Sequence, residues 1–66
     1  MTTEREKPTV KLIGEDGNAF AILGRTERAL RRAGYSAEEI DRYREEATSA
    51  DYDHLIITTM RWVNVE

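Results

Sequence analysis

The sequence predicts a small, mostly helical α+β domain, with three short helices flanked by an N-terminal and a C-terminal strand that pair in a small two-stranded sheet. Three observations lead to this prediction. Apolar residues recur at helical spacing in three segments, each such segment follows a residue that can cap a helix, and apolar and polar residues alternate near both ends of the chain. A chain of 66 residues holds one domain at most.

The domain is expected to be shorter than the chain. Residues 1–9 are rich in charge and have no apolar side chain after the initiator methionine, so they cannot contribute to a core. We therefore expect residues 1–9 to form a disordered N-terminal arm and residues 10–66 to form a single compact domain.

The two strands are expected at the ends of this domain. A β-branched run over residues 9–13 predicts the first strand, and the alternation of Val63 and Val65 predicts a closing strand over residues 62–66. A lone strand would leave its main-chain polar groups unpaired, so the two strands should pair with each other. The sequence leaves parallel and antiparallel pairing open.

The first helix is predicted over residues 19–33, after a turn in which Asn18 or Asp16 can cap it. Arginines in its last turn and Gly34 after them are typical of a helix end. Gly24 lies inside this helix at a cost of about 1 kcal/mol relative to alanine, and we expect close packing to compensate. One face gathers Ala19, Ile22, Leu23, Thr26, Leu30 and Ala33.

Two further helices follow. Ser36 begins a capping-box sequence, which predicts a helix that starts at residue 37 and ends within residues 48–50. Asp51 or Ser49 can cap a third helix over residues 52–61. The expected apolar face of the third helix comprises Tyr52, Leu55, Ile56, Thr59, Met60 and Val63.

A domain of this size has little apolar surface to spare. Ordering costs about 1.5 kcal/mol per residue, and offsetting it takes on the order of 3,000–3,500 Å² of buried apolar area. We therefore expect nearly every large apolar side chain, Phe20 included, to lie in the core, leaving few for a deep pocket. Ile57 and Trp62 fall off the predicted apolar faces and are expected to be partly exposed.

Composition excludes several classes of function. The net charge of −3 weighs against general binding to polyanions. The chain has no cysteine, which excludes disulfides and thiolate chemistry. It also has no apolar run long enough for a membrane span or a signal peptide, so we expect a cytoplasmic protein that does not bind membranes.

No residue is assigned to catalysis, to a cofactor or to a metal. Asp51, Asp53 and His54 are the one cluster that resembles metal ligands, but they point in different directions at a helix start and no second histidine completes a site. His54 also lacks a partnered nucleophile. The turn over residues 14–18 has neither the lysine nor the hydroxyl residue of a phosphate-binding loop. We therefore do not expect an enzyme.

The candidate partner surface combines a cluster of arginines with one tryptophan. Guanidinium groups on one helix face could hold phosphates or a carboxylate-rich partner, or could simply pair with the acids of residues 38–46. The tryptophan could complete the core or lie at the centre of a contact surface. The members of this surface are Arg25, Arg28, Arg31, Arg32 and Trp62.

Three strings of the sequence resemble a family of small uncharacterised proteins encoded by bacteria, plasmids and bacteriophages: GEDGNAFAILGR at residues 14–25, ATSADYDHL at 47–55 and MRWVNVE at 60–66. The resemblance implies a bacterial or phage-borne intracellular protein and carries over no catalytic or ligand residue. The family pattern has glycine where this chain has Ala50, so Ala50 would be strained if that position required a positive φ.

Together these observations favour a small non-catalytic module that binds an unidentified protein partner or a second copy of itself. The alternative is a nucleic-acid-associated accessory protein that uses the arginine face of the first helix. Its binding would weaken steeply with salt.

Overall fold

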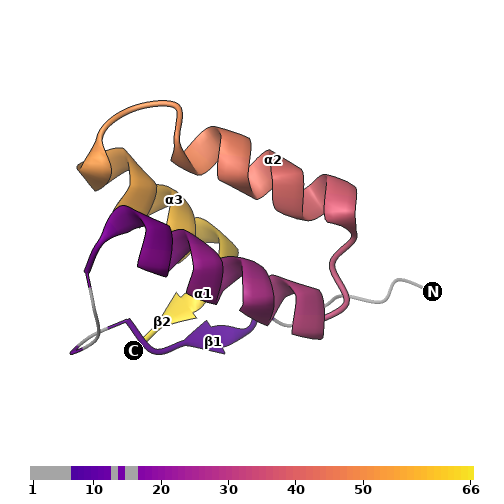
Figure 1. Ribbon diagram of the computed structural model, residues 1–66. Helices are drawn as coiled ribbons and strands as arrows, with labels where there is room; N and C mark the ends of the chain where they lie inside the picture. Colours follow the sequence, from indigo (N-terminus) through magenta and orange to yellow (C-terminus); the bar gives the residue numbers. More distant parts are fainter. Residues whose placement is uncertain (1–6, 13, 15–16) are drawn as a thin grey trace.

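Two short strands from opposite ends of the chain meet beneath three helices in the computed structural model, which describes residues 7–12, 14 and 17–66 (Figure 1). This arrangement confirms the predicted mostly helical α+β fold. The elements in order are β1 (Thr9–Val10), α1 (Ala19–Arg32), α2 (Ala37–Ala47), α3 (Tyr52–Trp62) and β2 (Asn64–Val65).

The two strands pair in parallel, which settles the orientation that the sequence leaves open. The Asn64 N–H donates to the carbonyl of Pro8 at 2.9 Å, and the Leu12 N–H donates to the carbonyl of Glu66 at 2.8 Å. Pairing therefore starts at Pro8, two residues before the expected domain boundary. Of the expected arm, residues 1–6 lie outside the described residues, as does Ile13 of the predicted strand.

Local signals in the sequence locate the helix starts correctly. The side chain of Asn18 accepts a hydrogen bond from the Ala21 N–H at 3.0 Å. Ser36 forms both bonds of its capping box, and Asp51 caps α3. Ser49, the other candidate cap for α3, instead donates its hydroxyl hydrogen to the carbonyl of Glu46.

The helix ends differ from the predictions by one to three residues. Helix α2 ends at Ala47, before the predicted end within residues 48–50. Helix α1 ends at Arg32, with Ala33 as its C-cap and Gly34 at a φ of +95° directly after it. Helix α3 continues to Trp62, and the closing strand is correspondingly shorter than predicted. These shifts leave the order of elements unchanged.

The core collects apolar side chains from β1, from all three helices and from the residue before β2. Its buried members are Val10, Ile22, Leu23, Leu30, Ile40, Tyr43, Ala47, Leu55 and Val63. Three threonines, Thr26, Thr58 and Thr59, are fully buried among them. The predicted inward face of α1 is confirmed for Ile22, Leu23, Thr26 and Leu30, but Ala19 is exposed and Ala33 is half-buried.

A hydroxyl cluster lies inside this core. The hydroxyls of Tyr43 and Thr59 form a hydrogen bond of 2.7 Å between α2 and α3. Burial raises the pKa of the Tyr43 phenol, while the nearby hydroxyls of Thr59 and Thr26 act in the opposite direction. The buried Thr26 hydroxyl still lacks a partner in hydrogen-bonding geometry among the described residues.

The expectation that almost all large apolar residues are buried is wrong for Phe20, Tyr52 and Met60, which are 85%, 47% and 56% exposed. On a helix with 100° per residue, Phe20 points roughly opposite to the buried Ile22. Helix α3 turns its threonines inward instead of Met60. The Tyr52 hydroxyl lies outside the core and donates a hydrogen bond to the carbonyl of Gly17.

Candidate interaction surfaces

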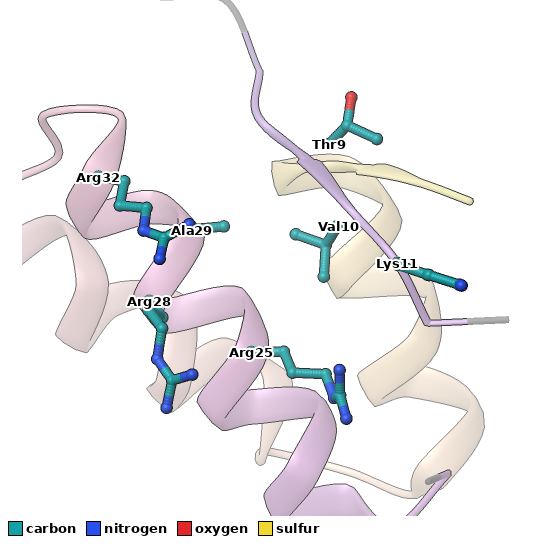
Figure 2. Close-up of a pocket in the computed structure, with 7 residues that line it drawn as sticks. All are labelled: Thr9, Val10, Lys11, Arg25, Arg28, Ala29 and Arg32. Carbon is teal, nitrogen blue, oxygen red and sulfur yellow. The ribbon is translucent and has the colours of Figure 1, made fainter. Parts of the chain in front are cut away.

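A shallow groove of about 210 Å³ between α1 and β1 brings together three of the four predicted arginines (Figure 2). The three arginines leave α1 one after another along its length, and the side chain of Val10 points toward the helix beside them. We call this feature the arginine groove. It is lined by Thr9, Val10, Lys11, Arg25, Arg28, Ala29 and Arg32, and Arg31 is not among its residues.

Two arginines of α1 form no ion pair with the acids of α2 among the described residues. The side chains of Arg28 and Arg32 are exposed and form neither an ion pair nor a hydrogen bond within the part of the chain that the structure describes. The ion pair between helices α1 and α2 instead has its arginine on α2 and its acid on α1. The Arg44 guanidinium of α2 donates two hydrogen bonds to the Glu27 carboxylate of α1, at 2.7 and 3.1 Å.

Trp62, the other predicted contact residue, is half-buried at the end of α3. Its ring packs against those of Tyr35 and Tyr43, with centroids 6.1 and 5.8 Å away. Its indole N–H donates to the Glu46 carboxylate at 3.4 Å. These contacts favour completion of the core over a role as the centre of a contact surface, which stays a prediction for its exposed part.

A second surface, which the sequence analysis missed, lies where α1 begins. Two adjoining grooves of about 250 and 220 Å³ share Leu23 and Thr48 and lie beside the exposed ring of Phe20. We call it the Phe20 surface. Its lining residues are Ala19, Phe20, Leu23, Gly24, Arg44, Ala47, Thr48, Ala50, Asp51, Tyr52 and Leu55.

Gly24 keeps one of these grooves open. The expectation that Gly24 packs closely against a neighbouring element is wrong, because a Cβ atom built there would meet nothing within 4 Å. The cost of a glycine inside a helix is therefore not offset by contacts within the described chain. Phe20 and Gly24 are four residues apart and share one side of α1, a spacing that could have revealed this surface from the sequence.

The cluster at the start of α3 does not converge on a common point. The Asp51 carboxylate accepts a hydrogen bond from the His54 main chain. The His54 ring nitrogen Nε2 lies 2.9 Å from the carbonyl of Glu46, to which it donates. Among the described residues, no three acidic or histidine side chains are grouped to hold a metal ion. Glu15 and Asp16 of the glycine-rich turn lie outside those residues.

Comparison with protein-family models, with curated proteins and with solved structures found no match in any of the three. The resemblance to a bacterial and bacteriophage family therefore stays a prediction. Ala50, where that family has glycine, does not adopt a positive φ, so its backbone is not strained. None of the described helices combines the length and the apolar character needed to cross a bilayer.

Proposed function

We propose that this protein is a non-catalytic interaction module that acts in the cytoplasm and binds a second copy of itself through the Phe20 surface. The observation that carries the proposal is an 85% exposed phenyl ring beside a groove that Gly24 leaves open. An exposed aromatic side chain of this size is costly to keep in water and is a common anchor of protein interfaces.

A second copy is the occupant that this surface fits best. A two-fold interface must be self-complementary, because the same patch faces itself across the axis. The Phe20 surface has both a projecting ring and an adjoining groove, so each ring can enter the groove of the other copy. Eleven residues line its two grooves, fewer than the roughly 20–30 residues that each partner contributes to a standard interface, so we expect a weak, micromolar dimer.

Polar groups at the rim also suit such a dimer. The Arg44 guanidinium and the Glu27 carboxylate already neutralise each other at the edge of the groove. Its hydrogen bonds to Glu27 raise the pKa of the exposed Arg44, so this guanidinium stays charged and hydrated at the rim. Docking an apolar ring next to it therefore leaves no charge buried without a partner.

Sedimentation equilibrium over micromolar to millimolar protein concentrations tests the proposal. We expect a reversible monomer–dimer equilibrium that Phe20→Ser abolishes. Ile57→Ser is the matched control, since Ile57 is also an exposed apolar residue, at 51%, but does not line either groove. A strict monomer at every concentration, or equal weakening by both substitutions, would refute self-association through this surface.

A further inference from the structure

We infer that the arginine groove is a second binding site, independent of the Phe20 surface, which takes an extended acidic peptide segment as an added strand next to β1. Three features carry this inference: the open main-chain edge of β1, the row of guanidinium groups beside that edge, and the absence of aromatic side chains from the groove.

The open edge follows from the hydrogen bonds of the sheet. Along β1 and its flanking residues, the groups that bond to the C-terminal segment 64–66 belong to alternate residues and include the carbonyls of Pro8 and Val10 and the N–H of Leu12. The main chain of Thr9, which lies between them, therefore points to the opposite edge, where no other strand of the described chain lies. An unpaired edge of this kind is the template for strand addition.

This edge is also part of the groove wall. In Figure 2 the side chains of Thr9 and Lys11 point away from α1, so these residues offer the groove mainly their main chain. A strand that pairs with Thr9 would run between β1 and the exposed guanidinium groups of Arg28 and Arg32. Main-chain bonds would then supply part of the affinity and the arginines would select the side chains.

The spacing of the arginines suits an extended acidic segment. Arg28 and Arg32 are four residues apart, so their Cα atoms are separated by about 6 Å along the helix axis. Side chains on one face of a strand recur at about 6.6 Å. Carboxylates at alternate positions of the added strand can therefore each meet one guanidinium group.

The same features disfavour two other occupants. A second copy pairing edge to edge through β1 would bring two arginine rows together, and like charges at close range repel. Single-stranded nucleic acid is usually held by aromatic side chains that stack on its bases, and none lines this groove. The net charge of −3 further opposes a long polyanion.

Fluorescence anisotropy with a short synthetic peptide of alternating valine and glutamate tests the inference on the full chain. We expect the Arg28→Gln/Arg32→Gln variant to bind at least about tenfold more weakly, since charge-assisted hydrogen bonds are lost. Arg31→Gln, on the same helix but outside the groove, is the matched control and should change affinity by less than about twofold. A peptide with glutamine in place of glutamate should bind as weakly as the double variant.

Thr9→Pro tests whether the peptide bonds to the main chain of β1, because proline removes the outward N–H of residue 9 without breaking a hydrogen bond between β1 and β2. We expect weaker peptide binding by Thr9→Pro with an unchanged melting temperature, and slower hydrogen exchange of the Thr9 amide when the wild-type chain holds the peptide. Equal binding of the glutamine peptide, no binding at millimolar peptide, or full binding by a folded Thr9→Pro variant would overturn the inference. An oligothymidylate or DNA duplex that binds more tightly through the same arginines would overturn it in favour of nucleic acid.

Discussion

Beneath α2 and α3 the molecule buries hydroxyl groups, whereas at the first turn of α1 it leaves a phenyl ring in water. Tyr43 and Thr59 are fully buried and bonded to each other. Phe20 is 85% exposed beside a groove that a glycine keeps open. An arrangement that only minimised free energy in an isolated chain would be expected to place these groups the other way round.

The contrast separates what holds the fold together from what remains available for binding. The buried hydroxyls cost little because Tyr43 and Thr59 satisfy each other, and their bond joins two helices at a fixed position. The exposed ring and the helix-interior glycine have no such compensation within the described chain. Two such costs at one place are the basis for the proposed dimer surface.

Truncation of the two aromatic side chains should give the largest difference between these regions. Tyr43→Ala removes a buried ring and should lower the free energy of unfolding by about 3–5 kcal/mol. Phe20→Ala should change it by no more than about 0.5 kcal/mol when the protein is dilute enough to be monomeric. Urea denaturation of the two variants measures both values, and a large loss for Phe20→Ala would mean that its ring packs within the monomer.

Two buried threonines offer a finer test inside the core. Thr59→Val leaves the Tyr43 hydroxyl without its partner and should destabilise the fold by about 1–3 kcal/mol. Thr26→Val removes a buried hydroxyl that has no hydrogen-bond partner among the described residues, so it should be neutral or stabilise by up to about 1 kcal/mol. Thermal melts of the two variants compare the signs. Destabilisation by Thr26→Val as large as that by Thr59→Val would show that the Thr26 hydroxyl is satisfied in solution.

The sequence predicts the α+β architecture and the helix starts well because those signals are local. A capping side chain and the main-chain N–H that it binds lie three residues apart, as in Ser36 with Glu39. Periodicity also places Thr26 and Thr59 on inward faces, and both are buried, but it misses the buried Thr58 and favours Met60 in its place. The bond between Thr59 and Tyr43 is not predicted, because the two residues lie sixteen positions apart on different helices.

In the candidate surfaces too, the features set by spacing along one helix could be predicted, and those set by packing between elements could not. Helical spacing places Arg25, Arg28 and Arg32 together, and the structure brings them into one groove. The contribution of Thr9 depends on β1 packing against α1 and could not be predicted from spacing. The Phe20 surface was missed because a chain with few apolar side chains is expected to bury every large ring. The position of Phe20 on the helix, roughly opposite to Ile22, indicates the contrary.

A smaller effect is expected from Gly24→Ala, which acts where α1 borders the groove. A Cβ at this position meets open space, so the substitution should stabilise the fold by about 0.5–1 kcal/mol through helix propensity alone. It should also weaken the dimer, because the methyl group occupies part of the groove. Chemical denaturation at low concentration and sedimentation at high concentration measure the two effects separately. A less stable variant would show that Gly24 is tightly packed after all.

The smallest expected effect is a change in stability with pH that comes from the buried phenol of Tyr43. It is confined to alkaline solution. Its pKa is raised above the ordinary value of 10.0, chiefly by burial. The folded chain therefore keeps a proton that the unfolded chain releases. This contribution to stability is fully present below the unfolded pKa and is lost as the pH rises through the folded pKa.

Urea midpoints measured across this alkaline range should fall less steeply with pH for Tyr43→Phe than for the wild-type chain. The variant has no phenolic proton to lose, although it is less stable at every pH because Thr59 loses its partner. Tyr52→Phe is the matched control, since the Tyr52 side chain is largely outside the core and bonds only to the carbonyl of Gly17 among the described residues. Parallel pH profiles for Tyr43→Phe and the wild type would mean that water reaches the phenol. The contrast between a closed core at Tyr43 and an open surface at Phe20 would then fail.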